Sequence, residues 1–265
     1  HTWNNNFRWD SNFTLSHNKN KIKELVRDYV HPETGELINK DRLDVGGLGK
    51  ARFILKEGGT LGDLYTQSDL KRDDNGMVDI DPTGIVAIEN NLPDIKLGSV
   101  FPKANLAWSN HFSWKGISLS ALFTARIGGI VYSATEAAMD QYGVSERSAL
   151  ARDNGGVLVN NRTLVDAQNY YTTIGSESGL PQYYTYNATN VRLQEASIGY
   201  LIPRKWLGNV CDIQVSVIGR NLWMIYNKAP FDPESVATTD NYYQGIDYFM
   251  LPSTRNIGFN VKINF

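Results

Sequence analysis

The last ten residues, 256–265, alternate strictly between apolar and polar side chains, and they limit the possible folds more than any other segment. A period of two places one set of side chains on each face of an extended strand. An aromatic residue at the end of such a strand suits a barrel that finishes at a membrane interface. The apolar set is Ile257, Phe259, Val261, Ile263 and Phe265.

The same alternation recurs upstream, in residues 3–15, 105–114, 117–127, 188–202 and 211–217. Several of these runs extend over roughly 12–16 residues, whereas strands of globular sheets average five or six and about 9–11 residues cross a bilayer. The length of the strands therefore favours a transmembrane antiparallel β-barrel over a soluble β-protein. The fold class that we expect is all-β.

Local signals add a turn, a bulge and an alternation of connection lengths. Lys115-Gly116 predicts a tight hairpin, and the phase slip near Gln194-Glu195 predicts a β-bulge. The link at 203–206 is short, whereas the segments at about 130–187 and 227–251 are long. Short turns on one side and long loops on the other are typical of outer-membrane barrels, whose long loops lie outside the cell.

Other segments suggest helix or irregular structure. Residues 133–152 are rich in Ala, Glu, Met and Leu and predict a short helix, and Lys21–Tyr29 is a weaker helical candidate. Residues 30–101 appear irregular in the sequence, with short hairpin pieces around 52–55 and 77–80.

Composition excludes several classes of function. A formal net charge of −2 gives no field for nucleic acid, and the single cysteine excludes an internal disulfide. No run of eighteen apolar residues marks a transmembrane helix. The sequence opens with His1 and has no apolar leader, so we expect the secretion signal to lie elsewhere or to have been removed.

The order and spacing of several segments resemble the C-terminal portion of SusC-like (RagA-like) TonB-dependent transporters. Each segment is degenerate alone, and together with the terminal Phe265 they are specific. The segments are NFTLSHNKNKI (12–22), KEGGTLGDLY (56–65), DDNGMVDID (73–81), PKANLAWSNHFSWKGISLSALFTARIGG (102–129), ARDNGG (151–156), NVRLQEASIGYLIPRKWL (190–207), VSVIGRNLWMIYNKAPFDPES (215–235) and NIGFNVKINF (256–265).

The resemblance implies that residues 1–265 form the C-terminal part, about eight strands, of one 22-stranded barrel in the bacterial outer membrane. It implies partners that this chain lacks: the N-terminal barrel strands and plug, the TonB complex and a SusD-like surface lipoprotein that closes over the mouth. The implied function is import of an oligosaccharide or oligopeptide without a cofactor and without covalent chemistry, in contact with outer-membrane lipid.

Aromatic rings beside amides and carboxylates in the two long loops suit sugar rings or extended peptides, through stacking and hydrogen bonding. The same tyrosines could instead pack loop against loop. The predicted substrate-contacting residues are Tyr170, Tyr171, Tyr183, Tyr184, Asp232, Glu234, Asn241, Tyr242, Tyr243 and Gln244.

No catalytic or metal-binding motif emerges. The four histidines lack zinc-ligand spacing, no G-x-S-x-G sequence is present, and the calcium-like start at Asp73, Asn75 and Asp79 lacks its closing Glu. Alternation instead places four cations on the polar strand faces, pointing into the lumen, where they would pack against the plug or contact substrate. They are Arg126, Arg192, Arg220 and Lys262.

Two other folds remain open. A small self-closed barrel, acting as an adhesin or a structural membrane protein, requires residues 1–16 to pair with residues 253–265. A soluble carbohydrate-binding β-sandwich requires the apolar strand faces to be buried and the chain to fold without detergent.

Overall fold

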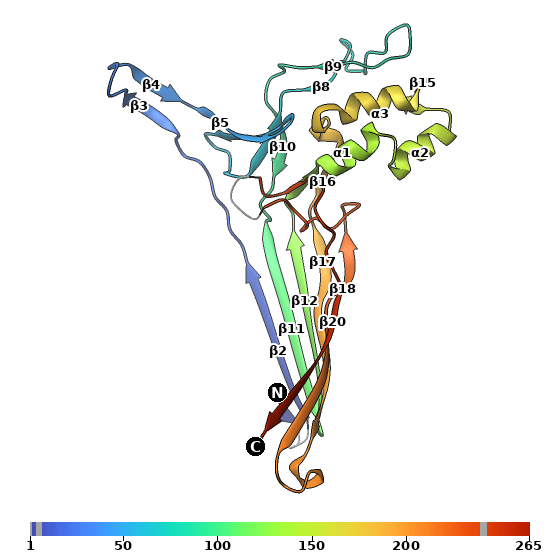
Figure 1. The fold of residues 1–265 in the computed structure, drawn as a ribbon. Coiled ribbons are helices and arrows are strands. Elements are labelled where there is room, and N and C mark those ends of the chain that lie inside the picture. Colours follow the sequence, from blue (N-terminus) through green and yellow to red (C-terminus); the bar gives the residue numbers. More distant parts are fainter. Residues whose placement is uncertain (1, 4–6, 239–242) are drawn as a thin grey trace.

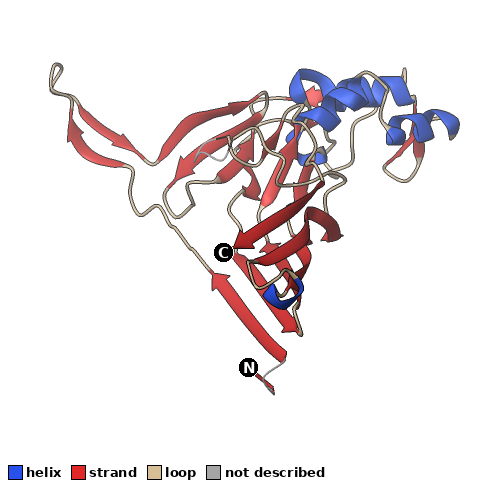
Figure 2. Ribbon diagram, turned by 60° about the horizontal axis from the view of Figure 1, so that its bottom comes forward, coloured by secondary structure: helices blue, strands red, loops and turns tan. Residues whose placement is uncertain are grey.

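A single antiparallel sheet of long strands dominates the computed structural model, which describes residues 2–3, 7–238 and 243–265. Its strand order is β1-β2-β11-β12-β17-β18-β20, so that β1 and β20 form the two edges (Figures 1 and 2). We call it the main sheet. Its strands are β1 (Thr2–Trp3), β2 (Phe7–Ser16), β11 (Ala104–Trp114), β12 (Ile117–Ile127), β17 (Asn190–Ile202), β18 (Asp212–Asn227) and β20 (Asn256–Asn264).

The two faces of the main sheet differ in chemistry because the apolar positions of neighbouring strands lie in register. One continuous row across six strands is apolar throughout: Trp9, Phe112, Leu119, Ile198, Val217 and Phe259. A row on the opposite face is polar or bare: Arg8, Ser113, Ser118, Gly199, Ser216 and Asn260. The apolar face is not packed against other protein, since Val217 is 50% exposed and Phe259 is 81% exposed.

The predicted hairpin and bulge are both confirmed. Trp114 pairs with Ile117 across Lys115 and Gly116, which both have positive φ (47° and 89°), as a type I′ turn requires. The register between β12 and β17 shifts where Gln194 has no partner, between Leu193 and Glu195. This extra residue keeps the apolar positions on one face along the whole of β17.

Connection length alternates between the two ends of the main sheet. Residues 115–116 and 203–211, which contain the short 3-10 helix η4 (Arg204–Trp206), close one end. Residues 17–103, 128–189 and 228–255 all emerge at the other end (Figure 1). The described parts of these three long connections fold together, and we call the resulting unit the cap.

The cap combines small sheets with helices. Its larger sheet has the order β10-β7-β6-β5, and β13 pairs with β16 and, in parallel, with β19. The helices are α1 (Ala134–Gln141), α2 (Glu146–Asp153), α3 (Ala167–Gly175), η2 (Ser176–Ser178) and η3 (Pro181–Tyr183). The strands are β3 (Val26–Val30), β4 (Leu37–Lys40), β5 (Arg42–Leu48), β6 (Ala51–Lys56), β7 (Asp63–Thr66), β8 (Asp69–Leu70), β9 (Ile88–Glu89), β10 (Ile95–Ser99), β13 (Ile130–Ser133), β14 (Val157–Val159), β15 (Thr163–Val165), β16 (Thr185–Asn187) and β19 (Ile246–Asp247).

One apolar core joins all three connections. Phe53 and Leu64 come from the first, Tyr132 and Tyr184 from the second and Ile246 from the third, and all are at most 2% exposed. The cap is therefore a packed structure whose parts depend on one another. Within the described residues, no helix is both long and apolar enough to cross a membrane.

Two expectations for the first long connection are wrong, and one expectation for the second long connection is refined. Lys21–Tyr29 is not helical, because Val26–Val30 forms β3 and pairs with β4. Residues 30–101 contain the four-stranded sheet of the cap and are therefore not irregular, although the hairpin piece expected around 52–55 is present as β6, which pairs with β5. The single helix expected over 133–152 is present as α1 and α2.

Two carboxylates hold the cap sheet together. Asp63, which is 1% exposed, accepts from the Thr60 amide (3.0 Å) and hydroxyl (2.6 Å) and pairs with Lys96. Asp94 pairs with Arg42 at 2.8 Å and with Lys56 at 2.7 Å. Hydrogen bonds from Arg42, and then from Lys56, outweigh desolvation and lower the pKa of Asp94 from 3.8 to about 2.

The two-faced main sheet predicts that arginine is tolerated on only one face. In the full-length protein, Val217→Arg should impair insertion into bilayers, since a cation facing lipid costs about 2–4 kcal/mol at the midplane. The matched variant Ser216→Arg places the same charge on the polar face, between Gly199 and Asn260. Insertion is measured by heat-dependent gel mobility after reconstitution. Equal insertion of the two variants would contradict the assignment of the faces.

The cap sheet should lose stability in acid through Asp94. Because its pKa is depressed when folded, its contribution is complete above pH 3.8 and disappears as the pH falls towards 2. Hydrogen–deuterium exchange of β5 and β6 should accelerate over that window in the native protein, and Asp94→Asn should remove the acceleration. Asp74→Asn, in an exposed turn, is the control and should leave the pH profile unchanged.

Candidate functional site

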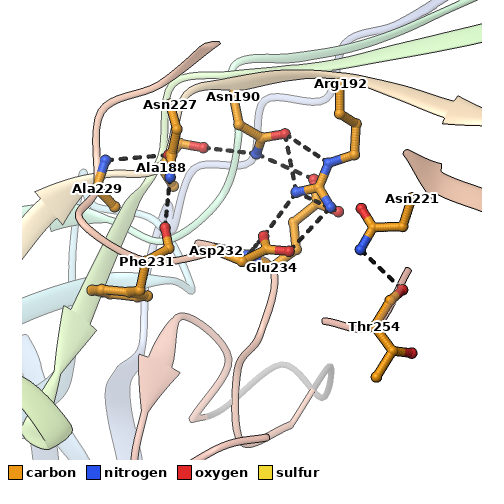
Figure 3. A network of polar contacts seen from close by, with 10 residues as sticks. All are labelled: Ala188, Asn190, Arg192, Asn221, Asn227, Ala229, Phe231, Asp232, Glu234 and Thr254. Carbon is orange, nitrogen blue, oxygen red and sulfur yellow. Dashed lines mark hydrogen bonds and ion pairs between the residues drawn. The ribbon is translucent and has the colours of Figure 1, made fainter. Parts of the chain in front are cut away.

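The most concentrated polar network lies where the polar face of the main sheet meets the cap (Figure 3). Arg192 of β17 forms a two-pronged ion pair with Asp232, with Nη2 2.8 Å from Oδ1 and Nη1 3.2 Å from Oδ2. Its Nη2 is also 3.4 Å from Oε2 of Glu234. Asn190 accepts from Nε of Arg192 at 3.2 Å and donates to Oε1 of Glu234 at 3.2 Å.

The third connection reaches this network because the end of β18 holds it in a tight turn. The Asn227 amide donates to the Phe231 carbonyl at 2.6 Å and accepts from the Ala229 amide at 3.2 Å. The Phe231 ring then contacts Tyr186 edge to face, with centroids 5.7 Å apart. The chain is thereby turned back over the polar face, and Asp232 and Glu234 are brought to Arg192.

The Arg192–Asp232 pair is buried, and neither partner can be removed without a cost in stability. The side chains are 4% and 11% exposed, so that removal of either partner would leave a buried charge. Desolvation alone would raise the pKa of Asp232, but the hydrogen bonds from Arg192 and others outweigh it and the pKa is lowered. The Asp232 carboxylate is therefore charged at neutral pH.

A second arginine nearby has no such partner. Nη2 of Arg126, on β12, donates to the Val100 carbonyl at 2.8 Å, whereas its Nε is buried without a hydrogen bond. In the part of the chain that the structure describes, no carboxylate lies within 4.0 Å of this guanidinium. Arg126 and Glu234 line a pocket of about 380 Å³ on the polar face.

The predicted tyrosines of the second connection belong mainly to the packing of the cap. Tyr170 and Tyr171 contact each other edge to face at 5.4 Å, and with Tyr183 they pack half-buried against the core. Tyr184 has no exposed surface, and its hydroxyl donates to Asp140 at 2.9 Å. Burial raises the pKa of Tyr170 to about 12 and also raises that of Tyr184.

The predicted residues of the third connection are divided between two places. Asp232 and Glu234 meet in the network at Arg192, whereas Tyr243 lies in the cap, where its ring contacts Phe53 edge to face at 6.2 Å. Tyr243 is 42% exposed, and Gln244 beside it is partly buried. Asn241 and Tyr242 lie outside the described residues.

A buried polar cluster in the helices was not predicted from the sequence. Asp140, which is 1% exposed, accepts from the Ser145 hydroxyl at 2.5 Å and from Nε of Arg147 at 2.9 Å, besides Tyr184. Ser145 also caps α2. Ser145, a residue type preferred at helix N-caps, could have revealed the break between α1 and α2, although no local signal reveals the Asp140–Tyr184 contact.

The chemistry available here is recognition by charge and hydrogen bonding. Among the described residues, no three side chains of His, Cys, Asp or Glu are grouped to hold a metal ion. The calcium-like segment forms a turn, in which Oδ1 of Asp73 accepts from the amides of Asn75 and Met77 at 2.9 Å each.

Comparison with known proteins gives one curated relative and several solved structures. No model of a protein family matches the sequence. The chain is 25% identical to the TonB-dependent receptor P3 of Formosa agariphila over 292 aligned positions, which cover 98% of this chain and 27% of that protein.

Solved structures share the fold over essentially the whole chain. The RagAB peptide importer in its closed-closed state matches 100% of this chain and 28% of its own, with a TM-score of 0.65 and 16% identity. The open-open state matches 99% and 27%, with a TM-score of 0.62 and 15% identity. The chain thus spans about a quarter of the length of the proteins that it matches.

Because the Arg192–Asp232 pair is buried, we expect Arg192, and not Arg220, to hold the third connection in place. Arg192→Met should release residues 229–236, since removing one partner of a buried pair costs about 3–5 kcal/mol. Arg220→Met breaks a pair with Glu195 in which Arg220 is 67% exposed and should have little effect. Hydrogen–deuterium exchange of residues 229–236 in the full-length protein compares the two variants. Equal protection in both would show that the pair does not hold this connection.

Proposed function

We propose that this chain, which resembles SusC-like (RagA-like) TonB-dependent transporters in sequence and fold, forms part of an importer in the bacterial outer membrane. The cargo is an oligosaccharide or an oligopeptide, and energy arrives through TonB. A SusD-like surface lipoprotein closes over the cap. The protein's part is binding, sequestration and gated passage, without covalent chemistry.

The observation that carries this proposal is the combination of a two-faced main sheet with a cap at one end only. An exposed apolar face suits lipid, and an opposite polar face suits an aqueous lumen. The edges β1 and β20 have no further strand beside them among the described residues, and unpaired edges are not tolerated within a bilayer. Further strands of the same barrel would cover them.

The cap offers surfaces for both cargo and lid. A hairpin of β3 and β4 projects from it (Figure 1), and Tyr29, Val30 and Leu37 on this arm are each more than half exposed. Such a surface suits a protein partner. Substrate contact is best supported for Glu234, which lines the pocket on the polar face, and for the exposed Tyr243. It is much less well supported for Asp232, which is buried in its pair with Arg192, and for Tyr184, which would first have to leave the core.

The two rival folds are less well supported by the same observations. A self-closed barrel requires β2 or β1 to pair with β20, but β20 pairs only with β18 among the described residues. A soluble sandwich would bury the apolar face, which is open here.

The test is denaturing mass spectrometry of the native protein extracted from outer membranes in detergent, with identification of every chain that co-purifies. We expect this sequence within a polypeptide several times longer, accompanied by a surface lipoprotein. A lone polypeptide of 29.7 kDa that folds in detergent without companions would refute the importer and favour the self-closed barrel.

A further inference from the structure

The two arginines at the mouth of the sheet differ in what neutralises them. Arg192 has Asp232, Glu234 and the Asn190 carbonyl oxygen around it. Among the described residues, Arg126 forms a hydrogen bond with the Val100 carbonyl and no ion pair, and Glu234 attracts it only at longer range, although its side chain is partly buried. Glu234, the acidic residue in the same pocket, is already bound by Arg192 and Asn190. A guanidinium with unused donors in a pocket is a receptor for an anion.

The pocket at Arg126 continues into a neighbouring one. Ser16 and Asn105 line both the first pocket, of about 380 Å³, and a second of about 340 Å³. Arg126 and Thr124 belong to the first, and Asn18 and Phe101 to the second. Together they form a groove at the cap end of β2, β11 and β12, on the polar face of the sheet.

The lining of the groove matches one class of oligomer. It presents hydroxyl groups from Ser16 and Thr124, amides from Asn18 and Asn105, and one aromatic ring, that of Phe101. Hydroxyls and amides match the many hydroxyls of a sugar chain, and a ring offers a surface for stacking. The lining also includes the aliphatic side chains of Leu61, Pro102, Ala104, Leu106, Ala107 and Ala125, and the C–H faces of sugar rings can pack against such side chains.

We propose that this groove binds an acidic oligosaccharide, with a carboxylate or sulfate group of the sugar paired to Arg126. This inference rests on the proposed import function and names the substrate class of its lumenal site. The position supports cargo because Arg126 is the second-last residue of β12 and Ser16 is the last residue of β2, both at the cap end where cargo would enter. The incoming anion supplies a counter-charge to the guanidinium.

The test uses the full-length transporter with its co-purified partner in detergent. The probes are tetragalacturonate, compared with its carboxyl-reduced counterpart, and a chondroitin 6-sulfate tetrasaccharide, compared with a counterpart that is both desulfated and carboxyl-reduced. We expect the native protein to prefer an acidic probe, and Arg126→Gln to weaken binding of that probe about tenfold or more, as expected for a lost charge-assisted pair. Binding of the uncharged counterpart should be unchanged, and Arg126→Lys should restore part of the loss.

The matched control is Arg220→Gln, which removes an arginine from the same polar face that already pairs with Glu195 at 2.8 Å and should leave all affinities unchanged. Heat-dependent gel mobility checks that each variant is folded. The proposal is overturned if the native protein binds neither acidic probe, or if Arg126→Gln keeps the native affinities. The proposal is also overturned if Arg126→Gln lowers thermal stability but leaves the affinities unchanged, because the charge of Arg126 would then be neutralised by other protein groups.

Failure of the groove is distinguishable from failure of the importer. Tetra-alanine and its C-terminal amide are assayed in parallel, and a loss on Arg126→Gln confined to the free peptide would replace the sugar with a peptide carboxylate and overturn this inference. Co-purification of a longer chain and a lipoprotein is scored separately. If they are present while the sugar assays fail, the importer stands and the groove does not.

Discussion

The alignment of apolar side chains across neighbouring strands is the constraint on which the rest of the structure depends. A slip of one residue between two strands would move every apolar side chain of one strand to the opposite face. The unpaired Gln194 prevents such an inversion within β17, since Val191 and Leu193 before it and Ile198 after it all align with apolar partners. The register also decides that Arg126 and Arg192 share the polar face.

Buried carboxylates organise the long connections above the sheet. Asp63 in the first, Asp140 in the second and Asp247 in the third are each at most 7% exposed, and each accepts hydrogen bonds from neighbouring side chains. Long connections have few repeating backbone hydrogen bonds, and these buried carboxylates provide hydrogen bonds in their place. The apolar core then joins the three connections, so that local order and packing support each other.

The alternating strands were predictable because their two faces meet different surroundings, and a period of two is visible in a single sequence. Arg126 and Arg192 could be assigned to the polar face for the same reason. The strands β5 and β7 were missed, and β6 was expected only as a hairpin piece around 52–55, because these strands are short and depend on pairing partners and on the core. A helix was wrongly predicted for the segment 21–29 because Ile22, Leu25 and Val26 have helical spacing. Pairing of β3 with β4 instead makes Val26–Val30 a strand.

The site was predictable only in its parts. Asp232 and Glu234 were identifiable as polar residues of a loop, but their partner Arg192 lies 40 residues away from Asp232 in sequence. No local pattern encodes that distance. The same holds for Tyr184, whose aromatic ring suggested a ligand and whose contact with Asp140 across 44 residues places it in the core.

The parallel pair of β13 and β19 has a mechanical consequence. Tyr132 pairs with Ile246, Ser133 pairs with Asp247, and the Ser133 hydroxyl donates to the Asp247 carboxylate at 2.5 Å. Two connections that are far apart in the chain are thereby coupled, so that a pull on one is transmitted to the other. Gly128 and Gly129, both at positive φ, stand between β12 and this coupled pair. A load on the coupled pair would therefore reach β12 through these two glycines.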